Sequence, residues 1–148
     1  MSMEAGNLLR TSRMLGILVL GLGFLGACGK DASLVETALA DYCRSRSEGQ
    51  YQSYLDSTGG ELLLAALRDQ GTQQRMVTQG SNLAHEGIVL IETYVTSVEL
   101  DGIKRQAVAS YLEKFGKGLK TWAVHHQSQL EYIDQRWRVI SDRTMVAR

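Results

Sequence analysis

The ionisable residues best placed for acid–base chemistry are Glu92 and His126, each within a stretch of alternating apolar residues. Alternation puts every second residue of a strand on the same face, so both side chains could point into an apolar interior. Burial there would raise the pKa of the carboxyl toward neutrality, and the imidazole would be its partner in proton transfer. The alternative, which such isolated residues favour, is a surface Glu92 and a structural, hydrogen-bonded His126.

Two adjacent histidines, His125 and His126, raise the question of a metal site. Neighbours on a regular strand point to opposite faces, so the two rings cannot bind one ion. His85 lies in a segment expected to be a loop, and nothing fixes its position relative to either ring. The chain also lacks a Gly-x-Ser-x-Gly motif and a glycine-rich phosphate loop. We therefore expect no metal and no other cofactor.

Cys28 is the third residue with a chemical role, and the sequence before it explains which one. Arg10 and Arg13 precede an uncharged apolar run, residues 14–27, that ends in small side chains. As a helix this run would span about 21 Å, too short for a hydrocarbon core of about 30 Å. A basic flank, a short apolar core and a small-residue end are typical of a secretory signal peptide. We assign residues 1–27 to it.

The run Leu25-Gly26-Ala27-Cys28 resembles the lipobox of bacterial lipoproteins. The resemblance implies cleavage before Cys28, diacylation of its sulfur with chains such as palmitate, and attachment to a membrane. Two or three acyl chains hold a protein durably, whereas one does so only marginally. The residue after Cys28 is Gly29, whereas an aspartate at this position would favour retention at the inner membrane. In a Gram-negative host, the resemblance therefore implies the periplasmic face of the outer membrane.

Lipidation of Cys28 would leave Cys43 without a partner in its own chain. Cys43 lies on a helical apolar face with Val35, Leu39 and Tyr42, which favours a buried small hydrophobe. An intermolecular disulfide is the alternative. The mature chain is then residues 28–32, the acylated cysteine with a short tether, followed by a domain over residues 33–148. Ser33-x-x-Glu36 is a capping box that predicts the first helix of this domain.

The rest of the domain is predicted from its periodicity. Residues 51–55 and 61–70 read as short helices, and the polar residues 72–84, with Gly80 inside them, read as a loop. From residue 88 the pattern alternates, and turns near residues 101, 117 and 134 divide it into four strands, residues 88–100, 104–115, 119–133 and 136–146. Helices first and an antiparallel meander second predict an α+β fold.

This order, with the Trp137-Arg138-Val139-Ile140 run after the last turn, resembles the cystatin-like cone of nuclear transport factor two and its relatives. The resemblance implies N-terminal helices packed into the concave face of a curved four-stranded antiparallel sheet. It also implies an interior into which Trp122, Tyr94 and Tyr132 would point as candidate ligand-binding residues. Enzymes with this fold use an aspartate or an aspartate–histidine pair, and no aspartate lies on a predicted inward face.

Charge is unevenly distributed along the mature chain. Residues 29–100 carry 5 basic and 10 acidic side chains, and residues 101–148 carry 9 basic and 5 acidic ones. Such polarity suits either an ordinary solvated surface or docking between partners or on anionic headgroups. With no net charge overall, nucleic acid is not an expected partner.

Together these patterns predict a lipid-anchored domain of the cell envelope that acts as a binding or assembly component with a protein partner. A secretion or conjugation apparatus is one setting in which such domains occur. The alternative is a small envelope enzyme of the isomerase or dehydratase type, with Glu92 and His126 as its proton-transfer pair.

Overall fold

A computed structural model describes the backbone of residues 11–146 and the side chains from residue 29 onward. The predicted signal peptide and the side chain of Cys28 therefore lie outside the residues described in full. The chain divides into two compact units, Met1–Ser33 and Leu34–Arg148. Within the described residues, no helix has the length and apolarity needed to cross a bilayer.

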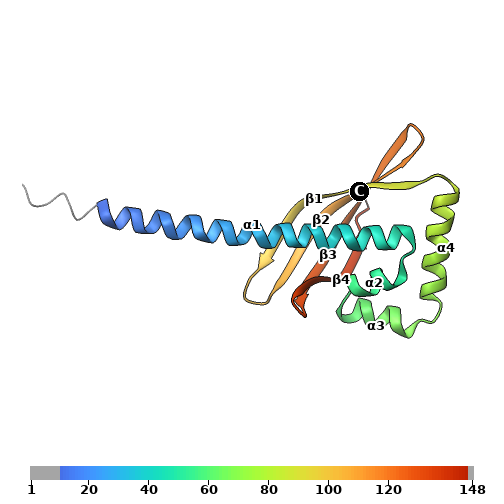
Figure 1. Ribbon diagram of the computed structural model, residues 1–148, viewed down its shortest axis with the longest axis horizontal. Coiled ribbons are helices and arrows are strands. Elements are labelled where there is room, and N and C mark those ends of the chain that lie inside the picture. The colour runs from blue at the N-terminus through green and yellow to red at the C-terminus, as the bar shows by residue number, and fades with distance from the viewer. Residues whose placement is uncertain (1–10, 147–148) are drawn as a thin grey trace, which may run out of the picture. The chain divides into compact units, whose positions relative to one another are not determined.

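Within residues 11–146, four helices precede the sheet (Figure 1). They are α1 (Thr11–Glu48), α2 (Tyr51–Ser57), α3 (Gly60–Arg68) and α4 (Thr72–His85). Ser33 lies inside α1, so the helix does not begin at the capping box. Helix α1 ends where Gly49 adopts φ +70°, the left-handed conformation that commonly terminates helices.

Four strands follow in sequence order and form one antiparallel sheet, β1-β2-β3-β4. They are β1 (Val89–Asp101), β2 (Gln106–Lys117), β3 (Lys120–Ile133) and β4 (Arg136–Thr144). The predicted α+β architecture is confirmed. Helices α2 and α3 meet the sheet at β4, where the Gly59 N–H donates to the Val139 carbonyl at 2.9 Å.

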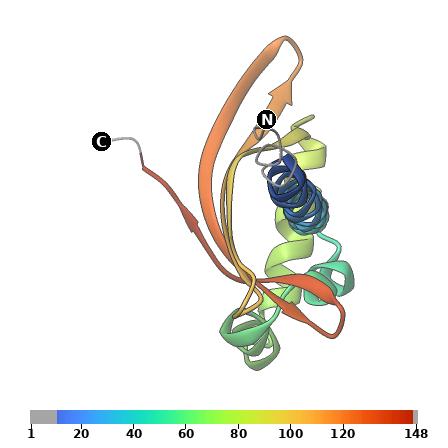
Figure 2. The same ribbon diagram turned by 90° about the vertical axis from the view of Figure 1, so that its left-hand side faces the viewer.

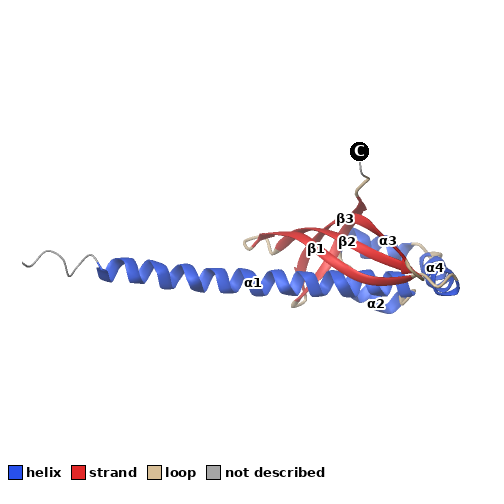
Figure 3. Cartoon of the chain, turned by 90° about the horizontal axis from the view of Figure 1, so that it is seen from above, coloured by secondary structure: helices blue, strands red, loops and turns tan. Residues whose placement is uncertain are grey.

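The domain part of α1, residues 34–48, lies over the concave face of the curved sheet (Figures 2 and 3). Its predicted apolar stripe is confirmed, because Val35, Leu39, Tyr42 and Cys43 are all at most 2% exposed. Residues three and four apart share one face of a helix, so these side chains enter the core together. The sheet supplies the facing residues of the core, which are Ala107, Ala109, Tyr111, Leu130, Trp137 and Val139.

Residues 72–84 are helix α4, so the expectation of a loop there was wrong. A buried stripe of Met76 and Gly80, four residues apart, faces the end of α1. A Cβ on Gly80 would lie 2.7 Å from the Glu48 carbonyl carbon and from the Gly49 nitrogen. Gly80 therefore permits close packing between α4 and α1 and does not interrupt the helix.

Three β-bulges determine which side chains face the interior. Strand β1 has an extra, unpaired residue at Ile91, because Leu90 and Glu92 pair with consecutive residues of β2. It has a second one at Thr96, because Val95 and Ser97 also pair with consecutive residues of β2. In strand β4 the extra, unpaired residue is Ile140, because Val139 pairs with Leu130 and Ser141 pairs with Gln129, the next residue of β3. Each bulge inserts one residue and switches the faces of the residues beyond it.

Candidate functional site

A cluster of four charged side chains lies between α1 and the concave face of the sheet. Arg46 of α1 reaches two carboxylates, with Nη2 2.6 Å from Glu113 Oε1 and Nη1 2.7 Å from Asp142 Oδ2. The carboxylate side chains are only 5% and 8% exposed, and that of Arg46 is 26% exposed. Burying any one of these charges without a partner would cost much free energy, so the charges can be buried only because they pair with one another.

His126 lies between the same two carboxylates. Its Nε2 is 3.0 Å from Glu113 Oε2 and its Nδ1 is 3.6 Å from Asp142 Oδ2. Neither contact has the direction of a linear N–H···O hydrogen bond, so the attraction is chiefly electrostatic. Burial lowers the pKa of His126, but the two carboxylates outweigh it and raise the pKa to about 9. At neutral pH the ring is therefore a cation, and the cluster holds two positive and two negative groups.

Hydroxyl groups complete the surroundings of Asp142. Its Oδ1 accepts hydrogen bonds from Ser128 at 2.7 Å and from the Tyr111 hydroxyl at 2.9 Å. Burial raises the pKa of Asp142, but His126, Ser128 and Arg46 outweigh it and hold this pKa well below its usual range. Tyr111 also stacks on the His126 ring, with centroids 5.3 Å apart. We call Arg46, Glu113, His126, Asp142, Tyr111 and Ser128 the interior charge network.

The local structure of each element explains how the network forms. Arg46 continues the buried stripe of α1 one turn beyond Cys43. On β2, the small residues Ala107 and Ala109 precede Tyr111 and Glu113 on the same inward face. On β4, the bulge at Ile140 turns Asp142 inward opposite Ser128, whereas regular alternation from Val139 would turn it outward.

The predicted pair of Glu92 and His126 does not form. His126 is buried and faces inward as expected, and His125 is exposed on the other face. Glu92 is exposed, because the bulge at Ile91 reverses the alternation and turns Thr93 inward in its place. The inward Glu92 that the proton-transfer alternative requires is therefore not found, and the favoured interpretation, a surface Glu92, agrees with the structure. The carboxylates that reach His126 are Glu113 and Asp142.

The three candidate ligand-binding aromatics are not brought together. Tyr94, 57% exposed, pairs in register with Leu112 on the outer face of the sheet, where the bulge at Ile91 also places it. Trp122, 41% exposed, stacks on Phe115 on the inner face near the β2–β3 turn. Tyr132 lies near the opposite end of β3 and makes an edge-on contact with Trp137.

Cys43 is fully buried, as the favoured interpretation expected. Burial raises the pKa of its thiol to about 12, and the charge of Glu113 adds to this effect. A thiol with so high a pKa is protonated at neutral pH, and it is the thiolate that reacts. Among the described residues, no group of three His, Cys, Asp or Glu side chains could hold a metal ion.

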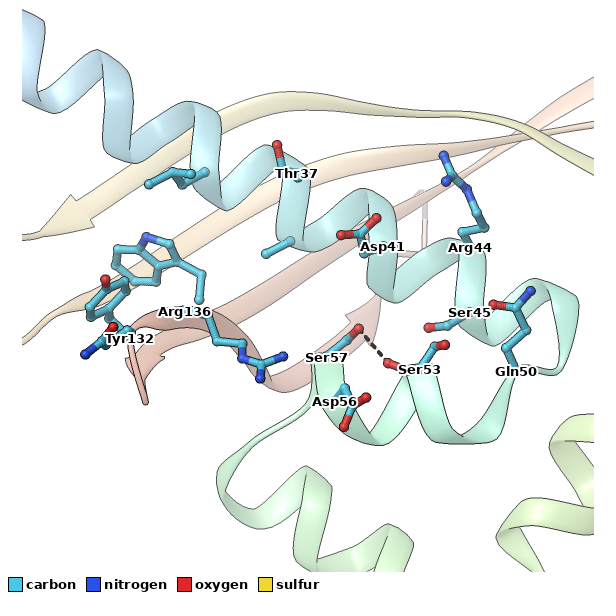
Figure 4. Close-up of a pocket in the computed structure, with 14 residues that line it drawn as sticks. Thr37, Asp41, Arg44, Ser45, Gln50, Ser53, Asp56, Ser57, Tyr132 and Arg136 are labelled. Atoms are coloured by element: carbon cyan, nitrogen blue, oxygen red, sulfur yellow. Dashed lines mark hydrogen bonds between the residues drawn. The ribbon is translucent and has the colours of Figure 1, made fainter.

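A groove of about 500 Å³ lies outside this interior, between α1, α2 and the β3–β4 turn (Figure 4). Figure 4 shows Ser45 of α1 opposite Ser53 of α2, with Arg136 extending from β4 toward α2. Tyr132 and Trp137 also line it. We call this cavity the α1–α2 groove, and its volume is in the range of ligand-binding pockets.

The α1–α2 groove contains charges of both signs. Asp41 and Asp56 contribute acidic groups, and Arg44 and Arg136 contribute basic ones. No described residue forms an ion pair with Asp41, Arg44 or Arg136 within the usual 4 Å. In contrast to the interior network, these charges are available to a ligand.

The arrangement of helices and strands has counterparts among solved structures. A candidate dehydratase of the NTF2-like family from Streptomyces avermitilis matches with a TM-score of 0.50 and 14% identity, over 81% of this chain and 99% of that one. The fold is NTF2-like. An NTF2-like protein of unknown function from Shewanella oneidensis matches over 77% of this chain and 98% of that one, with a TM-score of 0.49 and 11% identity.

No protein-family model and no curated protein matches the sequence. At these identities the structural likeness establishes the NTF2-like fold alone, since one fold supports many unrelated functions.

The interior charge network leads to a prediction about stability. Asp142→Asn keeps the side-chain shape but leaves Arg46 and His126 short of a negative charge, so we expect a loss of about 3–5 kcal/mol. Asp134→Asn is the matched control, because its side chain is 81% exposed on the β3–β4 turn, and it should cost less than about 0.5 kcal/mol. Urea unfolding of both variants measures the difference. Equal stability of the two would show that the network contributes nothing.

The same network predicts how stability depends on pH. His126 has a raised pKa, so its contribution is complete below about pH 6.5 and is lost as the pH rises through about 9. Glu113 and Asp142 have lowered pKa values, so their contribution is present above about pH 4.5 and is lost at lower pH. The free energy of unfolding should thus be greatest between these limits.

The alkaline decline can be assigned to one residue. The His126→Gln variant should have a lower free energy of unfolding at pH 6 than the unaltered protein. Between pH 6.5 and 9 its free energy of unfolding should fall much less, since no imidazole charge remains to be titrated. His125→Gln, on the exposed face of the same strand, should retain it. Urea unfolding at a series of pH values gives both curves. A decline that persists in His126→Gln would contradict the assignment.

Proposed function

We propose that this protein is a lipid-anchored component of the cell envelope that binds another protein through the α1–α2 groove. The observation that carries the binding role is the contrast between the two polar regions of the domain. The charges of the interior network are paired with one another and buried, whereas Asp41, Arg44 and Arg136 line an open groove and have no ion-pair partner among the described side chains.

The lining of the groove suits a polar segment of polypeptide. Its acidic and basic groups would pair with opposite charges of the partner, and its hydroxyl and amide groups would bond to backbone N–H and C=O groups. These polar side chains include Ser45, Ser53 and Gln50. Complementary charges mainly determine which partner is accepted and how fast it associates. An assembly role, as in a secretion or conjugation apparatus, is consistent with such a site.

The anchoring part of the proposal rests on the sequence around Cys28. A basic flank, a 14-residue apolar run and Leu25-Gly26-Ala27-Cys28 together meet the requirements of lipoprotein export and acylation. In a Gram-negative host, Gly29 then directs the protein to the periplasmic face of the outer membrane.

A second candidate is catalysis in the interior, as in the isomerase or dehydratase alternative. The observation that favours it is the pairing of His126 with Glu113 and Asp142, since an imidazolium held by carboxylates can act as a general acid. Against it, the side chains of His126 and Glu113 are only 6% and 5% exposed, and a substrate would have to displace packed residues to reach them. We therefore place this candidate second.

Membrane attachment is tested by replacing Cys28. Cys28→Ser removes the thiol that accepts the lipid, so the protein should move to the soluble fraction or accumulate as an uncleaved precursor. Cys43→Ser, which changes the other cysteine, should stay in the membrane fraction at the mature mass. Fractionation followed by mass spectrometry distinguishes these outcomes. If Cys28→Ser behaves like the unaltered protein on both counts, the lipoprotein proposal is wrong.

Binding in the groove is tested by site-specific photo-crosslinking in the cells that produce the protein. A benzoyl-phenylalanine at Ser53, in the groove, should crosslink to one defined partner. The same group at Gln129, exposed on the outer face of β3, should not.

A charge reversal supplies the specificity control. Arg136→Glu should reduce the Ser53 crosslink severalfold, whereas Arg143→Glu, near the far end of the same strand, should leave it unchanged. Crosslinking from Gln129 to the same partner, or equal effects of the two reversals, would contradict a role for the groove.

A further inference from the structure

The β1–β2 turn presents an aliphatic side chain directly to solvent. Ile103 is 97% exposed, and the next two residues, Lys104 and Arg105, are basic. The Asp101 carboxylate accepts hydrogen bonds from the backbone N–H groups of Ile103 at 3.2 Å and Lys104 at 3.1 Å. These bonds fix the backbone of the turn, so the exposure of Ile103 is built into a defined conformation.

This turn lies at the same end of the domain as Leu34, the residue at which the second unit begins. The Tyr132 N–H donates to the Arg105 carbonyl at 2.9 Å, and the Arg105 guanidinium lies over the Tyr132 ring at 5.3 Å. Tyr132 in turn lines the α1–α2 groove together with Leu34, the first residue of the second unit. Because the sheet is antiparallel, the β1–β2 and β3–β4 turns share this end, and the β2–β3 turn lies at the other (Figure 1).

The distance to the predicted lipid site is short in any conformation of the chain. Six residue-to-residue steps lead from Cys28 to Leu34. They span about 9 Å as a helix and no more than about 22 Å when fully extended. An acylated Cys28 would therefore hold this end of the domain close to the bilayer surface.

The charges at this end favour an anionic surface. The two turns contain the bases Lys104, Arg105 and Arg136. Their two acids are Asp101, which pairs with Lys104 at 3.7 Å, and Asp134, which pairs with Arg138 outside the turns at 3.7 Å, so the two turns keep a net positive charge. Basic side chains near a membrane are attracted to anionic headgroups, and an exposed aliphatic side chain gains by leaving water for the interface.

We propose that Ile103, Lys104 and Arg105 form a second membrane contact, the docking tip, which binds anionic phospholipid headgroups and inserts Ile103 among them. The inference rests on the proposed lipid anchor at Cys28. The docking tip would fix the orientation of the domain on the bilayer, which a single attachment point does not.

The other end of β2 offers a matched control. There Leu119 is fully exposed between Lys117 and Lys120, a second aliphatic residue with basic neighbours. The two turns are separated by the 12 residues of β2, or about 40 Å at the rise of a strand. If an aliphatic residue with basic neighbours were sufficient, both turns would bind the membrane. If the anchor determines which end is near, only the docking tip binds.

The experiment uses the mature, natively lipidated protein in vesicles of phosphatidylcholine and phosphatidylglycerol. Ile103→Cys and Leu119→Cys are each labelled with an environment-sensitive NBD fluorophore, and buried Cys43 does not compete for the label. We expect a blue shift and a severalfold rise in emission at position 103, quenched by spin-labelled lipid, and no such change at position 119.

Charge variants and salt test the electrostatic part. Lys104→Gln with Arg105→Gln should reduce the signal at position 103 severalfold, as should vesicles of phosphatidylcholine alone or high salt. Lys117→Gln with Lys120→Gln should leave it unchanged.

Flotation of the vesicles on a density gradient separates the two proposals. Protein that floats without a shift at position 103, or with equal shifts at both positions, overturns the docking tip and leaves the anchor intact. Protein that does not float overturns the anchor and the docking tip together.

Discussion

The contacts of Arg46 with Glu113 and Asp142 hold the two layers of the domain together. Arg46 belongs to α1, and its two partners belong to β2 and β4, so one guanidinium joins the helix to two strands that are not neighbours. His126 of β3 contacts the same carboxylates from the sheet. Because charges in an interior are tolerated only when they are paired, the position of each element is constrained by the others.

This balance of charge also determines what the interior can do. With Arg46 and His126 positive and two carboxylates negative, the network is neutral as a whole at pH 7. Its strongest acceptor, Asp142, is saturated by Arg46, Ser128 and Tyr111. A substrate would have to replace several short contacts at once. The same residue types that enzymes use for proton transfer therefore act here as a cross-link between helix and sheet.

Periodicity was sufficient to predict most of the fold from the sequence. The apolar stripe of α1 and the alternation of four strands gave the order of elements, because these patterns report directly on which face is buried. Helix α4 was missed because residues 72–84 are mostly polar and because Gly80 lies among them. Its role is close packing against Glu48 and Gly49, which depends on a neighbouring element and leaves no trace in the local pattern.

The candidate site was predicted less well, and the reason is the bulges. A single extra residue at Ile91 turns Glu92 outward, and one at Ile140 turns Asp142 inward. Strict alternation therefore offered Glu92 as the candidate partner of His126 and placed no aspartate on an inward face, although Asp142 is there. Arg46 and Glu113 lie 67 residues apart in the sequence, so their pairing could not be inferred from local spacing. The run of Ala107, Ala109, Tyr111 and Glu113 on one face was the available indication of a buried carboxylate.

Because the side chains of Glu113, His126 and Asp142 are buried, the proposed binding role falls to the outside of the domain, where the α1–α2 groove and the docking tip lie at one end. Tyr132 lines the α1–α2 groove and also carries the backbone and ring contacts to Arg105 of the docking tip. If the tip rests on a bilayer, the groove is held beside that bilayer at a fixed orientation. A partner segment would then be bound along the membrane surface. Rigidity from the interior charge network is what makes such an orientation possible, because the helix that forms one wall of the groove cannot shift relative to the sheet without breaking paired buried charges.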